Sequence, residues 1–267
     1  MIMLTHDRPK AGYIDVGDLK IYYEDHGVGW PLVLLHGGLT TGDMMWGDRV
    51  PALAQYFRVI VPDSRGHGRT NNPAGTLNYS QMADDVAGLI SALGLIRPTI
   101  IGYSDGAQIA LELGLRHPDQ MTALILGGVV TQPTTQYLAA LGDMGFSQPG
   151  QLDFDQFERV YPEFFDTIKT AHAHVYGPEY WRRFFLQISE LWLGLPTYAD
   201  EALATILVPS LIITGDRDET GSLDESLRLY RLLPKAELAV IPDADHSAGE
   251  SELFWGAVQD FLIRHVA

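Results

Sequence analysis

The chain has 267 residues, of which 46% are hydrophobic and 19% charged, a balance typical of one large folded domain with room for an insertion. Cysteine is absent, which excludes disulfides, thiolate catalysis and cysteine-ligated zinc. The formal net charge of -16 repels polyanions and therefore argues against nucleic acid or an acidic membrane surface as a partner.

No apolar run approaches the roughly 20 residues that span a bilayer. Residues 1–10, "MIMLTHDRPK", reach charged residues too soon to hold the apolar core of a signal peptide. We therefore expect a cytoplasmic protein, a monomer or homodimer, whose partner is a small molecule.

Short runs rich in Val, Ile and Leu alternate with longer segments of helical period, as in a parallel sheet covered by helices on both faces. An antiparallel hairpin is predicted over 11–16 and 19–27. Six more strands are predicted at 31–38, 57–68, 98–104, 121–130, 208–219 and 236–246. Helices are predicted at 44–55, 79–95, 106–118, 223–234 and 250–266. The expected fold is α/β, with a mostly parallel eight-stranded sheet flanked by helices.

The pattern is interrupted after the sixth strand by residues 131–205, which are helical over 154–173 and 179–194 and carry about half of the chain's aromatic residues. Such an insertion predicts a lid, or cap, over the carboxyl ends of the strands, with residues 1–130 and 206–267 forming the core domain. Alternatively, its aromatic residues build only the insertion's own core. The side chains expected to contact substrate are Tyr103, Phe146, Tyr161, Trp181, Phe185 and Trp192.

Ser104 lies in Gly102-Tyr103-Ser104-Asp105-Gly106, the G-x-S-x-G spacing of a nucleophile elbow. A turn sharp enough to project the hydroxyl above the sheet strains the serine backbone, and side chains two residues away on either side would clash. The motif stands where a predicted strand meets a predicted helix, which is the context it requires. Ser104 is therefore the candidate nucleophile.

A serine nucleophile needs a base, oriented in turn by an acid, and both are expected on loops after later strands. His246 follows the last strand and is the candidate base. "LIITGDRDE" offers Asp216 and Asp218 as acids and does not decide between them. His36 and His67 precede the elbow and are interpreted as structural. His172 and His174 lie in the insertion, without an evident third ligand for a metal.

Acyl transfer also needs backbone N–H groups directed at the developing oxyanion. Asp105, the residue after the nucleophile, supplies one. The glycines of "LLHGGL" let the backbone curl over the site, so that Gly38 or Leu39 supplies the other. No metal or organic cofactor is expected.

In order and approximate spacing, "LLHGG", "PDSRGHGRT", "GYSDGA", "LIITGDRDE" and "IPDADH" resemble the α/β-hydrolase family across nearly the whole chain except the insertion. "YSDG" before an aliphatic helix is similar to the branch with valacyclovir-hydrolase-like and 3-oxoadipate enol-lactonase-like enzymes. The resemblance implies Ser104 as nucleophile, His246 as base and Asp218 as acid. In "GRT", Thr70 stands at a position where many members of the family have serine. Epoxide hydrolases and haloalkane dehalogenases of this fold have Asp at the centre of the nucleophile elbow. Ser104 therefore argues against both of these activities.

The expected activity is hydrolysis of a small apolar carboxylic ester or lactone through an acyl-enzyme. Similar triads also serve carbon–carbon bond hydrolases, thioesterases and cofactor-free perhydrolases. A ligand receptor that keeps the triad is a further alternative, from a different class of function.

Overall fold

The computed structural model describes residues 10–266; residues 1–9, which make up most of the segment considered for export, lie outside the described residues. The central sheet has eight strands in the order β1-β2-β4-β3-β5-β6-β7-β8. Their bounds are β1 Lys10–Val16, β2 Leu19–His26, β3 Trp30–Leu35, β4 Phe57–Pro62, β5 Thr99–Tyr103, β6 Ala123–Gly127, β7 Ser210–Gly215 and β8 Ala236–Ile241. Strands β3 to β8 are parallel to one another, while β1 pairs antiparallel with β2 and β2 with β4. The predicted fold class is confirmed.

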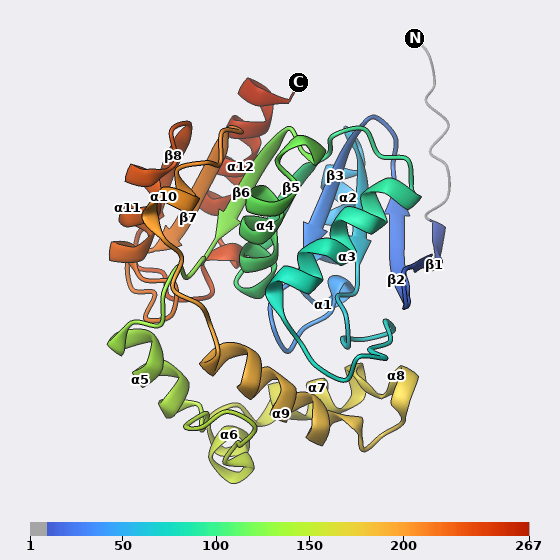
Figure 1. The fold of residues 1–267 in the computed structure, drawn as a ribbon, viewed down its shortest axis with the longest axis vertical. Helices are drawn as coiled ribbons and strands as arrows, with labels where there is room; N and C mark the ends of the chain where they lie inside the picture. The colour runs from blue at the N-terminus through green and yellow to red at the C-terminus, as the bar shows by residue number, and fades with distance from the viewer. Residues whose placement is uncertain (1–9, 267) are drawn as a thin grey trace.

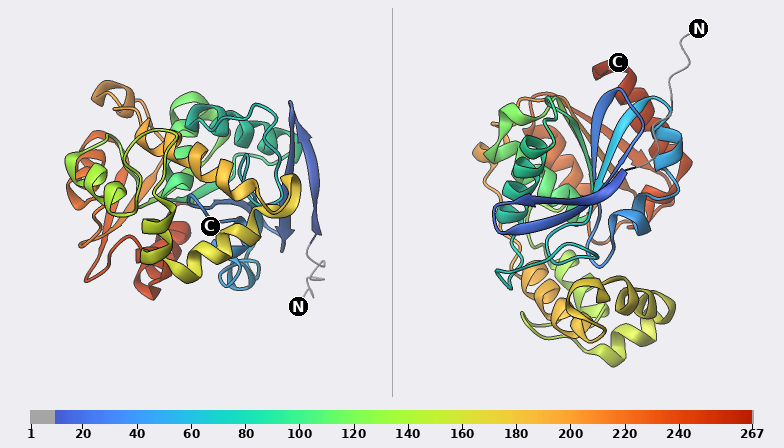
Figure 2. Two further views of the ribbon diagram at one scale, coloured as in Figure 1. Left: turned by 90° about the horizontal axis from the view of Figure 1, so that it is seen from below. Right: turned by 90° about the vertical axis from the view of Figure 1, so that its right-hand side faces the viewer.

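Both faces of the sheet are buried, because successive residues of a strand point to opposite faces. In β3, Val33 and Leu35 pack in one core, and Leu32 and Leu34 pack in the other. Helices α3, α4 and α11 cover the first face, and α1, α2 and α12 cover the second (Figure 2). The bounds of these helices are α1 Gly42–Trp46, α2 Val50–Leu53, α3 Tyr79–Ala92, α4 Asp105–Arg116, α11 Leu223–Leu232 and α12 Glu252–His265.

Between β6 and β7 the chain forms a group of helices beyond one end of the sheet (Figure 1). They are α5 Thr135–Asp143, α6 Phe154–Val160, α7 Pro162–Ala171, α8 Ala173–Tyr176 and α9 Tyr180–Leu193. A further short helix before β7, α10 Asp200–Leu203, lies beside α11. We call residues 131–205 the insertion. Within residues 10–266 no helix is long and apolar enough to cross a membrane.

Two predicted helices are broken in the structure, each at a proline. The segment 44–55 forms two short helices, and Pro51 lies in the first turn of the second. The segment 154–173 divides into α6 and α7, and Pro162 begins α7. Proline has no backbone N–H and clashes with the preceding turn, so a helix restarts at a proline more readily than it continues through one. The prediction followed the helical period on both sides of each proline and gave too little weight to the proline itself.

Candidate active site

Ser104 lies in the turn between β5 and α4 with φ 53° and ψ -119°, a strained conformation for a residue with a side chain. The two glycines of the motif permit this turn. A Cβ on Gly102 would lie 2.2 Å from the carbonyl oxygen of Gly106, and one on Gly106 would lie 2.0 Å from that of Leu35. Neither contact is tolerable, so glycine is needed at both positions for the turn to expose the serine hydroxyl.

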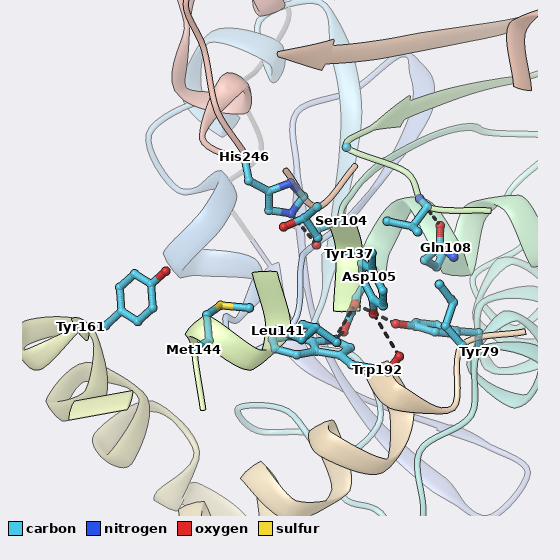
Figure 3. A pocket seen from close by; sticks show the side chains of 14 residues that line it. Tyr79, Ser104, Asp105, Gln108, Tyr137, Leu141, Met144, Tyr161, Trp192 and His246 are labelled. Atoms are coloured by element: carbon cyan, nitrogen blue, oxygen red, sulfur yellow. Dashed lines mark hydrogen bonds between the residues drawn. The ribbon is translucent and has the colours of Figure 1, made fainter. Parts of the chain in front are cut away.

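His246, on the loop after β8, points its ring at Ser104 (Figure 3), and the carboxylate of Asp218 lies on the other side of the ring. Its Nε2 is 3.0 Å from Ser104 Oγ, and its Nδ1 is 2.8 Å from Asp218 Oδ2. Because a carboxylate only accepts hydrogen bonds, Nδ1 carries the proton and Nε2 is left as the acceptor. This arrangement is able to take the serine proton.

Asp218, on the loop after β7, is the acid that the structure brings against His246. Its other oxygen, Oδ1, accepts hydrogen bonds from the N–H groups of Thr220 at 2.9 Å and Gly221 at 2.8 Å. Asp216 instead accepts from the N–H of Ala244 at 3.3 Å and so braces the loop that precedes His246. The buried Asp218 carboxylate is fixed on both oxygens, which fixes the imidazole in turn.

The loop after β3 passes close to Ser104 and carries the expected oxyanion donors. A Cβ on Gly37 would lie 3.3 Å from Ser104 Cβ. His36 Nδ1 and Thr40 Oγ1 both donate to the Gly37 carbonyl at 2.8 Å. Leu39 has φ 63° although it is not glycine. Among residues 10–266, the backbone N–H groups of Gly38, Leu39 and Asp105 have no hydrogen-bond acceptor, which leaves them free for a substrate oxygen.

The side chain of Asp105 has a second feature, which the sequence reasoning missed because it considered only the backbone. The carboxylate is buried and accepts from Tyr79 Oη at 2.8 Å and from Trp192 Nε1 at 2.9 and 3.0 Å (Figure 3). Burial raises the pKa of the Asp105 carboxyl, and the hydrogen bonds from Trp192 and Tyr79 oppose this rise. The carboxylate therefore ties helix α9 of the insertion to the nucleophile turn.

A cavity of about 150 Å³ opens between Ser104 and the insertion. Its polar lining includes Ser104, His246, Asp105 and Gln108. Its apolar wall comes largely from the insertion, through Tyr137, Leu141, Met144, Tyr161, Trp192 and Leu195. Helix α5 supplies Tyr137 and Leu141, and Met144 directly follows it. This helix had not been predicted, so sequence reasoning missed all three residues. The only available signal was their i, i+4 and i, i+3 spacing in a short segment.

Of the six side chains expected to contact substrate, the structure places two, Tyr161 and Trp192, at the cavity. The expectation is corrected for Phe146, Trp181 and Phe185, which pack with Phe157 and Phe165 in the insertion's own core. Helix α9 buries two faces, so an aromatic residue on it reaches the cavity only from the face that meets Ser104.

Tyr103 is corrected for a different reason: it lies under the base and does not line the cavity. Its hydroxyl donates to the carbonyl oxygen of His246 at 3.0 Å, and the two ring centroids are 5.6 Å apart. Successive residues of a strand end point in opposite directions, so the residue before the nucleophile turns away from the substrate. Tyr103 supports the loop that carries His246.

The described residues hold no group of three or more His, Asp or Glu side chains placed to bind a metal ion. His172 is fully engaged, since its Nδ1 accepts from the N–H of Gly68 at 2.9 Å and its Nε2 donates to the carbonyl of Leu39 at 3.1 Å. His174, its neighbour in "HAH", is exposed.

Comparison with known proteins agrees with this geometry. The model of the alpha/beta hydrolase family matches residues 32–252, which include Ser104, Asp218 and His246. The chain belongs to the alpha/beta hydrolase family. A curated relative of this alpha/beta hydrolase is the 2-hydroxymuconate semialdehyde hydrolase of Pseudomonas sp. strain CF600. The two are 30% identical over 257 residues, covering 91% of this chain and 90% of the relative.

Solved structures of other hydrolases resemble this alpha/beta hydrolase over nearly its whole length. Est816, described as an N-acyl homoserine lactone degrading enzyme, is 27% identical with a TM-score of 0.70, covering 96% of this chain and 100% of the other. The enol-lactonase from Burkholderia xenovorans LB400 is 24% identical with a TM-score of 0.73, covering 94% and 99%. The likeness to the enol-lactonase concerns the fold. Hydrolase activity follows from these comparisons, while the substrate does not.

Proposed function

We propose that the protein is a serine hydrolase that cleaves a small, uncharged carboxylic ester or lactone through an acyl-enzyme. The observation that carries the proposal is the hydrogen-bonded series Ser104, His246 and Asp218, of which Ser104 and His246 line the cavity. Fold alone would not support an activity, because this fold hosts many.

In the proposed mechanism, His246 Nε2 takes the proton of Ser104 as Oγ attacks the substrate carbonyl carbon, and the carbonyl oxygen becomes an oxyanion. The free N–H groups of Asp105 and of Gly38 or Leu39 stabilise that charge. The imidazolium then protonates the leaving alcohol oxygen, and the acyl-enzyme forms. Water, deprotonated by His246, attacks the acyl carbon and releases the acid and Ser104. Asp218 holds the imidazole in the required tautomer throughout.

Cavity size supports a small substrate. The cavity of about 150 Å³ is smaller than the roughly 300–1,000 Å³ of pockets that bind drug-sized ligands. That volume fits a short acyl chain or a small lactone ring. Its wall from the insertion is mainly apolar or aromatic, which suits carbon rather than charge.

A carbon–carbon bond hydrolase is the second candidate, favoured by the 30% identical relative, whose name denotes a muconate-type acid. The charge around the cavity supports the first candidate instead. Asp105 lines the cavity, and none of its described lining residues is Lys or Arg. A substrate carboxylate about 6 Å from the Asp105 carboxylate would be repelled by roughly 3 kcal/mol at an effective dielectric of 20, about 100-fold in affinity.

The test is a substrate panel run on wild type and Ser104→Ala. It contains 4-nitrophenyl esters from acetate to octanoate, simple lactones, the singly charged 4-nitrophenyl hemisuccinate and a meta-cleavage dienoate. We expect short neutral esters or lactones to have the highest kcat/KM, with hemisuccinate about 100-fold below butyrate. Asp105→Asn should narrow that gap, whereas Asp216→Asn should not. Preferential cleavage of the dienoate would establish the second candidate.

A further inference from the structure

His172 lies directly after α7 in the insertion and joins it to two loops of the core. Its side chain is buried, with 1% of the residue exposed. The ring accepts from the N–H of Gly68 and donates to the carbonyl of Leu39, and it stacks on Phe184 of α9 at 4.1 Å between centroids. Since Nδ1 accepts, Nε2 must carry the proton, so the two bonds together require the neutral ring in one tautomer.

Leu39 is the residue on which this bond acts. It holds a left-handed conformation, φ 63°, that an apolar residue adopts only where its surroundings impose it. The loop before it is fixed at Gly37 by His36 and Thr40. The carbonyl of Leu39 is fixed by His172. The Gly38–Leu39 amide, whose N–H has no acceptor among the described residues, thus lies between two peptide groups whose carbonyls are both held by hydrogen bonds, which restricts how far this amide is able to turn.

Building on the function proposed above, we propose that His172 is a positioning residue that holds Leu39 so that its N–H group faces the oxyanion. The insertion then completes the oxyanion site as well as covering the substrate. Trp192 of the insertion acts in the same direction, because it donates to Asp105, the residue that carries the second N–H donor. The residues that carry two of the candidate donors, Leu39 and Asp105, thus both have hydrogen bonds from the insertion.

Two substitutions separate the hydrogen bond to Leu39 from the rest of the His172 environment. Glutamine places an amide N–H near the position of Nε2 and keeps a donor for Leu39, so His172→Gln is the conservative variant. Asparagine places an oxygen near the position of Nδ1, so His172→Asn keeps an acceptor for Gly68 and loses the donor. His172→Phe keeps the stacking on Phe184 and loses both bonds.

The expected result is a fall in kcat of about 30- to 100-fold for His172→Asn and His172→Phe, because one misplaced oxyanion donor removes up to 10²–10³ of the rate. KM should stay within about threefold, and His172→Gln should recover most of kcat. A boronic acid that mimics the tetrahedral intermediate should lose affinity in proportion to kcat, while the product acid should not. The matched control is His174→Gln, which changes an exposed ring two residues away.

Thermal unfolding confirms that each variant is folded at the assay temperature, and either His172→Asn or His172→Phe is sufficient for the test. If the folded variant retains wild-type kcat, or if KM rises while kcat is unchanged, the positioning role is wrong. Labelling of wild-type Ser104 by a phosphonate, with loss of turnover in Ser104→Ala, tests the proposed function separately. If wild type passes this test while His172→Asn keeps the wild-type kcat, the role of His172 is rejected and the proposed function stands.

Discussion

Acid should destabilise this protein through its buried histidines, and His172 allows the magnitude to be worked out. Burial lowers the pKa of His172 from 6.5 to about 4. In the unfolded chain the ring takes up a proton near pH 6.5, while in the folded protein it stays neutral down to about pH 4. The unfolded state therefore binds more protons over this window, and the free energy of unfolding falls as the pH falls through it.

The difference between these pKa values corresponds to roughly 3 kcal/mol. For a single titrating group with these two pKa values, the free energy of unfolding falls by about 2 kcal/mol between pH 7 and pH 5. Burial also lowers the pKa of His36 and of His67, which act in the same direction. Burial raises the pKa of the Asp85 and Asp105 carboxyls, which acts in the opposite direction. Only a comparison with a variant isolates His172.

The assay is urea unfolding of wild type and His172→Gln at pH 7 and pH 5. Glutamine does not titrate, so the free energy of unfolding should drop by about 2 kcal/mol less in the variant than in wild type over this interval. His174→Gln, at an exposed position, should behave as wild type. Equal drops in wild type and His172→Gln would refute the claim that His172 is neutral in the folded protein.

Three further predictions concern the site. Asp218→Asn should lower kcat by about 10³- to 10⁴-fold and Asp216→Asn by less than about fivefold in the ester assay, because only Asp218 contacts His246; the reverse order would exchange their roles. Gly106→Ala should abolish soluble expression or lower Tm by more than about 8 °C, because its Cβ would lie 2.0 Å from the Leu35 carbonyl; an unchanged thermal melt would contradict this. Ester turnover should survive dialysis against EDTA unchanged, since the proposed proton transfers use side chains only; loss of turnover with recovery on adding a divalent metal would overturn the mechanism.

The contacts of the insertion with the nucleophile turn and the oxyanion loop bear on its role. Trp192 contacts Asp105, and His172 contacts Leu39. Tyr137 donates to the carbonyl of Trp192 at 3.0 Å and links α5 to α9 beside the cavity. A segment tied to the reacting groups in this way influences kcat as well as access. We expect changes in these polar contacts to affect turnover more than changes in the insertion's aromatic core.

Local sequence was sufficient for the fold class because each signal acts over few residues. Buried strands appear as runs of Val, Ile and Leu, and the turn at Ser104 needs two glycines at fixed spacing for steric reasons. His246 follows the last strand in the chain. Because parallel strands have their carboxyl ends at the same edge of the sheet, this position predicted that His246 lies near Ser104. The same reasoning could not choose between Asp216 and Asp218, which differ by two residues on one loop.

Only the tertiary structure decided which side chains meet across long separations. Asp218 reaches His246 because Thr220 and Gly221 turn its carboxylate inward. Aromatic composition indicated a covering insertion but could not tell Trp192, which faces Ser104, from Phe185, which faces the insertion's own core. His172 reaches Leu39, 133 residues away, only after α7 packs over the loop. The physical reason is that hydrophobic periodicity specifies that a face is buried, while the partner it buries against depends on how the elements dock.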